Sequence, residues 1–202
     1  MSAPGQIFVL SGPPGAGKST IAARVRAEMP DLAYSVSLTT RPPRPGEKDG
    51  VDYHFVSREE FARRIAAGEM AEYEEIFGNL YGTSEKVIRQ ALEQGRDLFL
   101  DTDVNGAEQL RKRFPDGVFI FLLPPSRQVL EQRLRGRATE SEDELRQRLE
   151  RVRYEVGKAG NYTYLVVNDD LDKAVEKVKA IITANRCRTE RHRQLLAEFL
   201  AP

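Results

Sequence analysis

Short apolar runs alternate with longer amphipathic stretches along most of this chain of 202 residues. Five runs are predicted to be strands: residues 7–10, 34–37, 98–100, 118–123 and 164–167. Apolar residues between them recur at helical spacing. Because a strand covered by helices on both faces is apolar throughout, the pattern predicts an α/β fold with a parallel β-sheet flanked by helices.

Two segments interrupt this alternation. Residues 37–83 are rich in Arg, Pro, Gly, Glu and Tyr, with strand-like stretches at 51–56 and 71–77 around a helix near 61–66. We interpret them as a small mixed α/β insertion that holds a second substrate. Residues 136–144 are polar and lie between two Arg-rich helices, as expected for a lid. We therefore expect a single domain whose core comprises residues 1–36, 84–135 and 145–202.

Composition removes several classes of function. Basic and acidic residues balance at 31 each, which gives no global field for nucleic acid or a membrane surface. The single cysteine, Cys187, excludes an intramolecular disulfide and a cysteine-rich metal site. No apolar run is long enough to cross a membrane. We expect a cytoplasmic protein.

The C-terminal residues 184–202 combine several arginines with a leucine-rich end. This pattern predicts a terminal helix with one apolar side. We expect packing or assembly into a homo-oligomer through this helix, and no nucleic-acid binding.

A glycine-rich loop follows the first apolar run directly. Residues 12–19 complete the pattern G-x-x-x-x-G-K-[ST], and apolar residues at helical spacing come next. Such a loop points its backbone N–H groups at phosphate, while Lys18 reaches the terminal phosphates and Ser19 ligates Mg²⁺. The sequence therefore predicts an ATP-binding set of Gly12, Pro13, Pro14, Gly15, Ala16, Gly17, Lys18, Ser19 and Thr20.

The insertion carries a second group of phosphate-binding side chains. Arg41 and Arg44 lie three residues apart in a proline-rich loop, and their guanidinium groups suit bidentate bonding to phosphate. Tyr53 and Tyr81 add hydroxyl donors. The alternative is that the arginines are solvated surface charges and the tyrosines are half-buried core residues.

Longer motifs resemble those of guanylate kinases. The resemblance rests on residues 35–47, 50–57, 77–83, 101–106 and 167–171, in the family's order, and extends from residue 6 to about residue 183. It implies the P-loop NTPase fold and transfer of the γ-phosphoryl group from ATP with Mg²⁺ to GMP or dGMP. The products are ADP and the nucleoside diphosphate, a reaction of purine nucleotide metabolism.

The resemblance also implies roles on the acceptor side. Glu72 matches the family's base-reading carboxylate, Ser37 and Thr83 match hydroxyls on the O6 and N7 side of guanine, and Asp103 accepts a further amino hydrogen. Arg41, Arg44, Tyr53 and Tyr81 match the family's grip on the acceptor phosphate. From spacing alone, Glu72, Glu74 and Glu75 could equally line the solvent face of a strand.

On the donor side, the resemblance implies charge stabilisation by Arg133, Arg137 and Arg148, in addition to Lys18 and Arg41. Asp101 would hold the metal through water, and Asn168 would lie near the donor adenine. The alternative for the three arginines is an exposed helix surface with ordinary ion pairs.

Two other functions remain open at this stage. A noncatalytic binding module related to guanylate kinases is disfavoured because Lys18, Ser19 and both insertion arginines are present. A related kinase that acts on a ribose bisphosphate is disfavoured because Glu72, Ser37 and Thr83 together argue for a base in the site.

Overall fold

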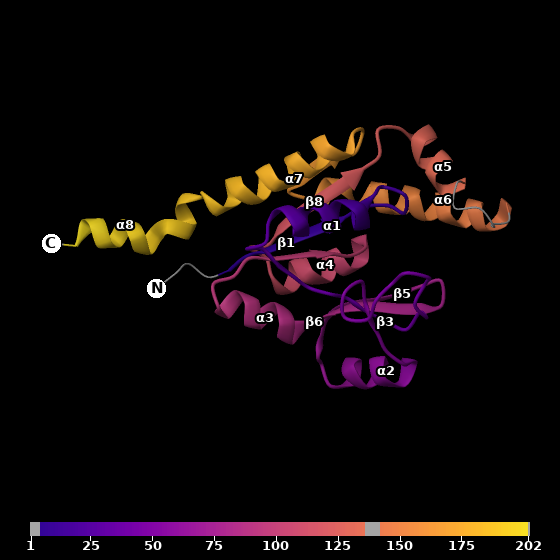
Figure 1. Cartoon of the computed structure of the whole chain (residues 1–202), viewed down its shortest axis with the longest axis horizontal. Helices are drawn as coiled ribbons and strands as arrows, with labels where there is room; N and C mark the ends of the chain where they lie inside the picture. Colours follow the sequence, from indigo (N-terminus) through magenta and orange to yellow (C-terminus); the bar gives the residue numbers. More distant parts are fainter. Residues whose placement is uncertain (1–4, 136–141, 202) are drawn as a thin grey trace.

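The computed structural model describes residues 5–135 and 142–201, without the side chains of residues 142–145 (Figure 1). Its centre is a parallel sheet with the strand order β2-β7-β1-β8-β9. These strands are β1 (Ile7–Ser11), β2 (Ala33–Tyr34), β7 (Leu98–Asp101), β8 (Val118–Leu123) and β9 (Tyr164–Val167). The predicted α/β fold is confirmed.

Helices cover both faces of this sheet. Along β1, Phe8 and Leu10 pack against α1 (Lys18–Glu28) and α7 (Leu171–Arg186). Ile7 and Val9 point to the other face, toward α3 (Glu85–Glu93) and α4 (Val104–Arg113). Every residue of β1 is buried, which explains why the strand is apolar almost throughout.

A second, smaller sheet has the strand order β4-β3-β6-β5. It comprises β3 (Leu38–Thr39), β4 (His54–Phe55), β5 (Met70–Ile76) and β6 (Asn79–Ser84), and α2 (Arg58–Ala66) packs on it through Phe61. The strand expected at 34–37 was wrong beyond Tyr34 because the chain passes from one sheet to the other at that point. The strand expected at 51–56 shortens to β4, because residues 50–52 form a turn, beside which Asp52 accepts the backbone N–H of Lys48.

Helices α5 (Arg127–Arg135) and α6 (Glu142–Gly157) form an arm beside the core (Figure 1). Leu130 and Leu134 of α5 pack against Val152 of α6. Of the segment predicted as a lid, residues 136–141 lie outside the described residues and residues 142–144 begin α6.

The C-terminal region continues as a helix beyond the core. A 3-10 turn, η1 (Ala159–Asn161), precedes β9, and a second one, η2 (Thr189–His192), leads into α8 (Arg193–Leu200). Leu195, Leu196, Phe199 and Leu200 are exposed on α8, which extends away from the body of the protein (Figure 1). The predicted terminal helix is present, and self-association through it stays a prediction. No helix among the described residues is long and apolar enough to cross a membrane.

Candidate active site

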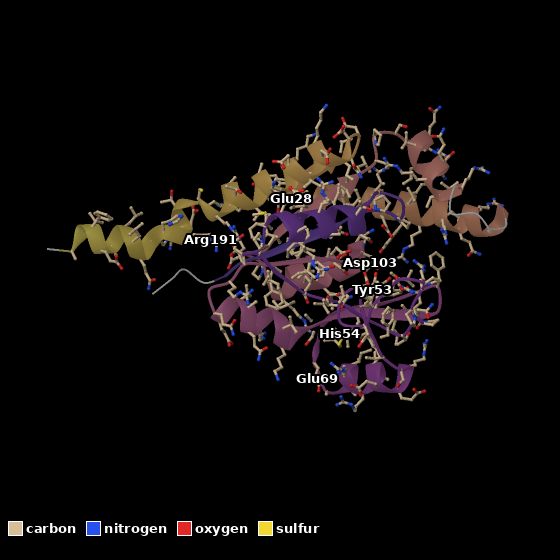
Figure 2. The ribbon with its side chains drawn as sticks, viewed as in Figure 1. Glu28, Tyr53, His54, Glu69, Asp103 and Arg191 are labelled. Carbon is tan, nitrogen blue, oxygen red and sulfur yellow. The ribbon has the colours of Figure 1, made fainter. Side chains whose placement is uncertain are left out.

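The carboxyl ends of the central strands form the floor of a cavity of about 420 Å³. Leu10 of β1 lies beside Asp101 of β7, and the backbone N–H of Thr102 bonds the carbonyl of Leu10. The loops after these two strands therefore meet at the crevice where ligands bind in open α/β sheets. Tyr53 and Asp103, which both line the cavity, lie near the middle of the molecule, between α1 and the second sheet (Figure 2).

The phosphate loop closes on itself between β1 and α1. A Cβ on Gly17 would lie 2.5 Å from the side-chain nitrogen of Asn168, and Gly17 has a φ of 99°, so glycine is required there. Lys18 Nζ donates to the carbonyl oxygens of Gly12 and Pro13. Burial lowers the pKa of Lys18, while the carboxylates of Glu155, Asp101 and Asp103 oppose that change. The lysine thus lies over its own loop at the cavity wall.

Ser19 and Asp101 present oxygen atoms to the same cavity. Tyr34 Oη donates to Asp101 Oδ1 at 2.6 Å, which fixes the carboxylate, and burial raises the pKa of Tyr34. No group of three or more His, Cys, Asp or Glu side chains suited to a metal ion occurs among the described residues. Hydroxyl and carboxylate oxygens fit Mg²⁺, which takes one or two protein ligands when phosphates supply the others.

The four insertion side chains predicted to hold a phosphate do line this one cavity: Arg41, Arg44, Tyr53 and Tyr81. The rings of Tyr53 and Tyr81 lie 6.0 Å apart, and Arg41 lies over Tyr53 at 5.3 Å. Both oxygens of Glu47 accept from Arg41 at 2.9 Å, and this pairing holds the pKa of Glu47 below its usual range. A phosphate bound by Arg41 would therefore compete with Glu47.

Glu72 is buried in the wall of the cavity, at 2% exposure. Its Oε1 accepts the Thr83 hydroxyl at 2.6 Å. Burial raises the pKa of Glu72 to about 7, with Thr83 opposing the rise and Asp103 adding to it. The alternative of a solvated Glu72 is wrong, whereas Glu75 on the same strand is exposed. A buried carboxylate with one committed oxygen is suited to accept hydrogen bonds from a ligand.

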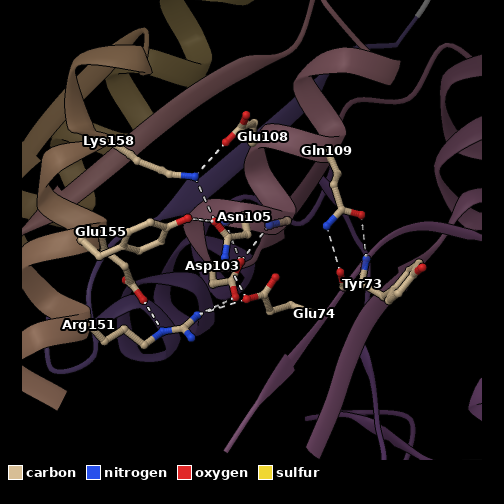
Figure 3. Close-up of polar contacts among 11 residues, drawn as sticks. Tyr73, Glu74, Asp103, Asn105, Glu108, Gln109, Arg151, Glu155 and Lys158 are labelled. Atoms are coloured by element: carbon tan, nitrogen blue, oxygen red, sulfur yellow. Dashed lines mark hydrogen bonds and ion pairs between the residues drawn. The ribbon is translucent and has the colours of Figure 1, made fainter. Parts of the chain in front are cut away.

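A charged cluster that was not predicted from the sequence lies on the cavity wall. Arg151 on α6 donates to Asp103 and to Glu155, and it lies 3.8 Å from Glu74 (Figure 3). All four side chains line the cavity. Arg148, Arg151 and Glu155 recur at spacings of three and four, which places them on one helix face and was the available signal. Only packing against α4 and β5 distinguishes this face from a solvated one.

Three of the predicted donor-side residues, Arg133, Arg148 and Asn168, do not line the cavity. Arg133 contacts the carbonyl oxygens of Gly15 and Asn168, each at 3.4 Å, so it adjoins the phosphate loop. Asn168 is buried and donates to the carbonyl of Ala16, where it supports the loop from behind. Arg148 lies 5.9 Å from the ring of Phe77, at the turn between β5 and β6, and Arg137 lies outside the described residues. Of the predicted guanine-side residues, Ser37 and Asp103 line the cavity and Thr83 supports Glu72 from behind.

A second hollow of about 580 Å³ lies near the C-terminal helices. Asp97, Arg186 and Arg191 line it, and Asp97 forms ion pairs with both arginines. It lies at the start of β7, opposite the phosphate loop, and we assign no chemistry to it.

Comparison with known proteins gives one consistent result. A family model described as guanylate kinase matches residues 5–185. The guanylate kinase of Syntrophotalea carbinolica is 49% identical over 189 residues, covering 94% of this chain and 90% of that protein. The guanylate kinase of Geobacter sulfurreducens is 44% identical over 201 residues, covering 100% and 99%. The crystal structure of guanylate kinase from Anaplasma phagocytophilum is similar with a TM-score of 0.77 and 34% identity, covering 95% of this chain and 91% of that one.

Proposed function

Since this chain belongs to the guanylate kinase family, we propose that its cavity binds ATP and GMP side by side and passes the γ-phosphoryl group between them, giving ADP and GDP. The protein is a nucleoside monophosphate kinase, an ATP:GMP phosphotransferase. One observation supports the proposed arrangement above all others: the phosphate loop and the buried Glu72 open onto the same cavity.

The acceptor phosphate binds between Arg41, Arg44, Tyr53 and Tyr81 in this proposal. Glu47 holds Arg41 in place before GMP arrives, and Arg41 then binds the phosphate in place of Glu47. A phosphate oxygen of GMP then attacks the γ-phosphorus in line. Because that oxygen is already negative, the reaction needs positioning and charge neutralisation more than a general base.

Glu72 selects the base. Guanine presents N1–H and an exocyclic amine on one edge, and a carboxylate accepts hydrogen bonds from both. Adenine presents no such pair of donors. A wrong base would leave the buried carboxylate desolvated and unpaired, which costs several kcal/mol. Thr83 holds one oxygen of Glu72 and thereby fixes the carboxylate.

On the donor side, the phosphate loop binds the ATP phosphates and Lys18 leaves the loop carbonyls to reach them. We propose that Ser19 ligates Mg²⁺ and that Asp101 holds it through water. The ion supplies charge neutralisation on the phosphates. Arg133, next to the loop, adds positive charge where the transferred group passes, and we propose the same role for Arg137 and Arg148.

The decisive experiment measures ADP production with GMP, dGMP, AMP, CMP and UMP as acceptors, with an acceptor-free control. We expect turnover with GMP and dGMP alone, and a loss of turnover of about a thousandfold in Lys18→Ala. If none of these nucleotides is phosphorylated, a ribose bisphosphate substrate or a binding module would be favoured.

We also propose a role in purine nucleotide recycling in the cytoplasm. GMP, dGMP and ATP are the substrates that this role requires. The exposed Cys187 suits a reducing compartment.

A further inference from the structure

The Arg151 guanidinium joins three parts of the protein (Figure 3). Nη2 lies 3.0 Å from Asp103 Oδ2 at the start of α4 and 3.8 Å from Glu74 Oε1 on β5, and Nε lies 2.8 Å from Glu155 Oε1 on α6. The Arg151 side chain is 21% exposed, and that of Asp103 is 10% exposed. Charge-assisted bonds in such partly desolvated places fix geometry more firmly than surface ion pairs do.

The two oxygens of Asp103 have different partners. Oδ1 accepts the backbone N–H groups of Asn105 and Gly106, at 2.9 and 2.7 Å, and so caps α4. Two hydrogen bonds use both lone pairs of that oxygen. Oδ2 accepts one bond from Arg151 and keeps one lone pair. That lone pair is the remaining acceptor position that Asp103 can offer to a ligand in the cavity.

The guanine edge needs more than one acceptor. N1–H and the two amine hydrogens make three donors, and Glu72 has already committed Oε1 to Thr83. Asp103 and Glu72 both line the cavity, and the Asp103 carboxylate adds to the rise in the pKa of Glu72. A second carboxylate beside Glu72 is therefore placed to accept the amine hydrogen that Glu72 does not take.

We propose that Arg151 is a positioning residue for base selection: it holds Asp103 Oδ2 so that its remaining lone pair accepts a hydrogen from the exocyclic amine of guanine. This inference rests on the proposed function, because it assumes a guanine nucleotide in the cavity. Arg151 does not touch the nucleotide, and its effect passes through Asp103. Nearby Asn105 Nδ2 donates to Glu74 Oε1 at 2.8 Å, which keeps the Glu74 carboxylate turned toward the guanidinium.

The experiment compares GMP with IMP, whose base lacks the amine. Arg151→Met keeps the length of the side chain without its charge or donors. We expect it to lower kcat/KM for GMP about tenfold, the loss typical of one hydrogen bond to a charged group, and to leave kcat/KM for IMP within about twofold. Arg151→Lys, which keeps the charge, should recover part of the GMP preference. The matched control is Arg153→Met, an exposed arginine two residues away on α6, which should keep the wild-type preference.

A double-mutant cycle tests whether Arg151 acts through Asp103. If it does, Arg151→Met adds little to the loss of GMP preference in Asp103→Asn. Equal losses for GMP and IMP, or additive losses in the cycle, would overturn the inference.

Calorimetric binding of GMP and IMP to the free protein separates this inference from the proposed function. A wild type that does not phosphorylate GMP would overturn the function. An Arg151→Met variant that binds GMP and IMP with the wild-type ratio would overturn only the role of Arg151.

Discussion

At the scale of single residues, Glu72 shows how burial changes the meaning of a glutamate. Three glutamates of β5 appear equivalent in the sequence, yet one is buried, one is half-buried and one is exposed. Burial raises the pKa of Glu72, and the hydroxyls of Thr83 and Thr102 oppose the rise; Thr83 donates to Oε1 at 2.6 Å. Such a group gains the most from a ligand that supplies matching donors.

Replacing Glu72 with Gln should separate the two substrates. The amide offers one acceptor where guanine needs two, so kcat/KM for GMP should fall about a hundredfold, while the KM for ATP stays within about twofold. Steady-state kinetics with each substrate varied in turn would measure both effects. Glu75→Gln, on the exposed side of the same strand, is the control. Equal losses for both substrates would contradict the base-reading role.

The raised pKa of Glu72 predicts a pH dependence of GMP capture. In the free protein, Glu72 has a pKa of about 7 and is protonated at lower pH. A protonated carboxyl accepts one hydrogen bond fewer. Asp103 and Glu74 face the same group and add to the rise. We therefore expect kcat/KM for GMP to fall as pH drops through about 7, and kcat to change less because bound guanine favours the ionised form. A pH profile that is the same in wild type and Glu72→Gln would contradict this.

The same residue predicts an effect on stability. Its folded pKa of about 7 exceeds the ordinary value of 4.5, so its contribution to stability is present below pH 4.5 and is lost as pH rises through about 7. The full difference corresponds to about 3 kcal/mol. Relative to wild type, Glu72→Gln should therefore gain about that free energy of unfolding between pH 4 and pH 8 without ligand. Urea unfolding at several pH values would measure it, and a constant difference would count against the buried charge.

At the scale of elements, α7 and the turn after it are held to the core by Asp97. This carboxylate, 6% exposed, accepts from Arg186 at 2.8 Å, from Arg191 at 2.7 Å and from the backbone N–H of Gln6 at 3.0 Å. Burial would raise its pKa, but the two arginines outweigh burial and lower it. The contact lies at the start of β7, whereas the cavity lies at the other end of that strand.

Asp97→Asn should lower stability and leave catalysis intact. It leaves two arginines without their shared counter-charge, which typically costs about 3 kcal/mol for a buried pair. Chemical denaturation would measure the loss, and kcat and KM should stay within about twofold of wild type. Glu190→Gln removes the exposed pair with Arg188 and should change stability by less than about 0.5 kcal/mol. A loss of activity in an Asp97→Asn variant that is fully folded would show that the contact at the start of β7 affects the cavity at the other end of that strand, and would contradict this prediction.

At the scale of the whole molecule, three parts of the protein bound the cavity: the core, the second sheet and the helical arm. The phosphate loop follows β1 of the central sheet, Glu72 lies on β5 of the second sheet, and Arg151 lies on α6 of the arm. In-line transfer requires the two phosphates to approach closely, so these parts must converge on the substrates.

We expect the molecule to become more compact when both substrate positions are filled. Small-angle scattering with a bisubstrate analogue should give a smaller radius of gyration than the free protein. ATP alone should give a smaller change, since it leaves the second sheet without its ligand. An unchanged radius with the analogue bound would speak against closure.

Much of the fold followed from local patterns. The central strands β1, β7, β8 and β9 lie within a residue or two of their predicted positions, because a strand buried on both faces must be apolar throughout. The strand at 34–37 failed after Tyr34, since apolar character cannot tell which of two sheets a residue joins. Strand β6 went unpredicted because its burial depends on pairing with β5, far more than on its own composition.

The sequence by itself determined the phosphate loop and the candidate acceptor residues, because each belongs to a short contiguous motif. Tertiary structure alone decided that Glu74, Arg151 and Glu155 also line the cavity. Arg151 and Asp103 are 48 positions apart, and Asn105 and Glu74 are 31 apart. A charged residue on a helix face has the same sequence pattern in water and in a cavity wall. Only the packing of α6 against α4 and β5 removes the water and supplies the partner.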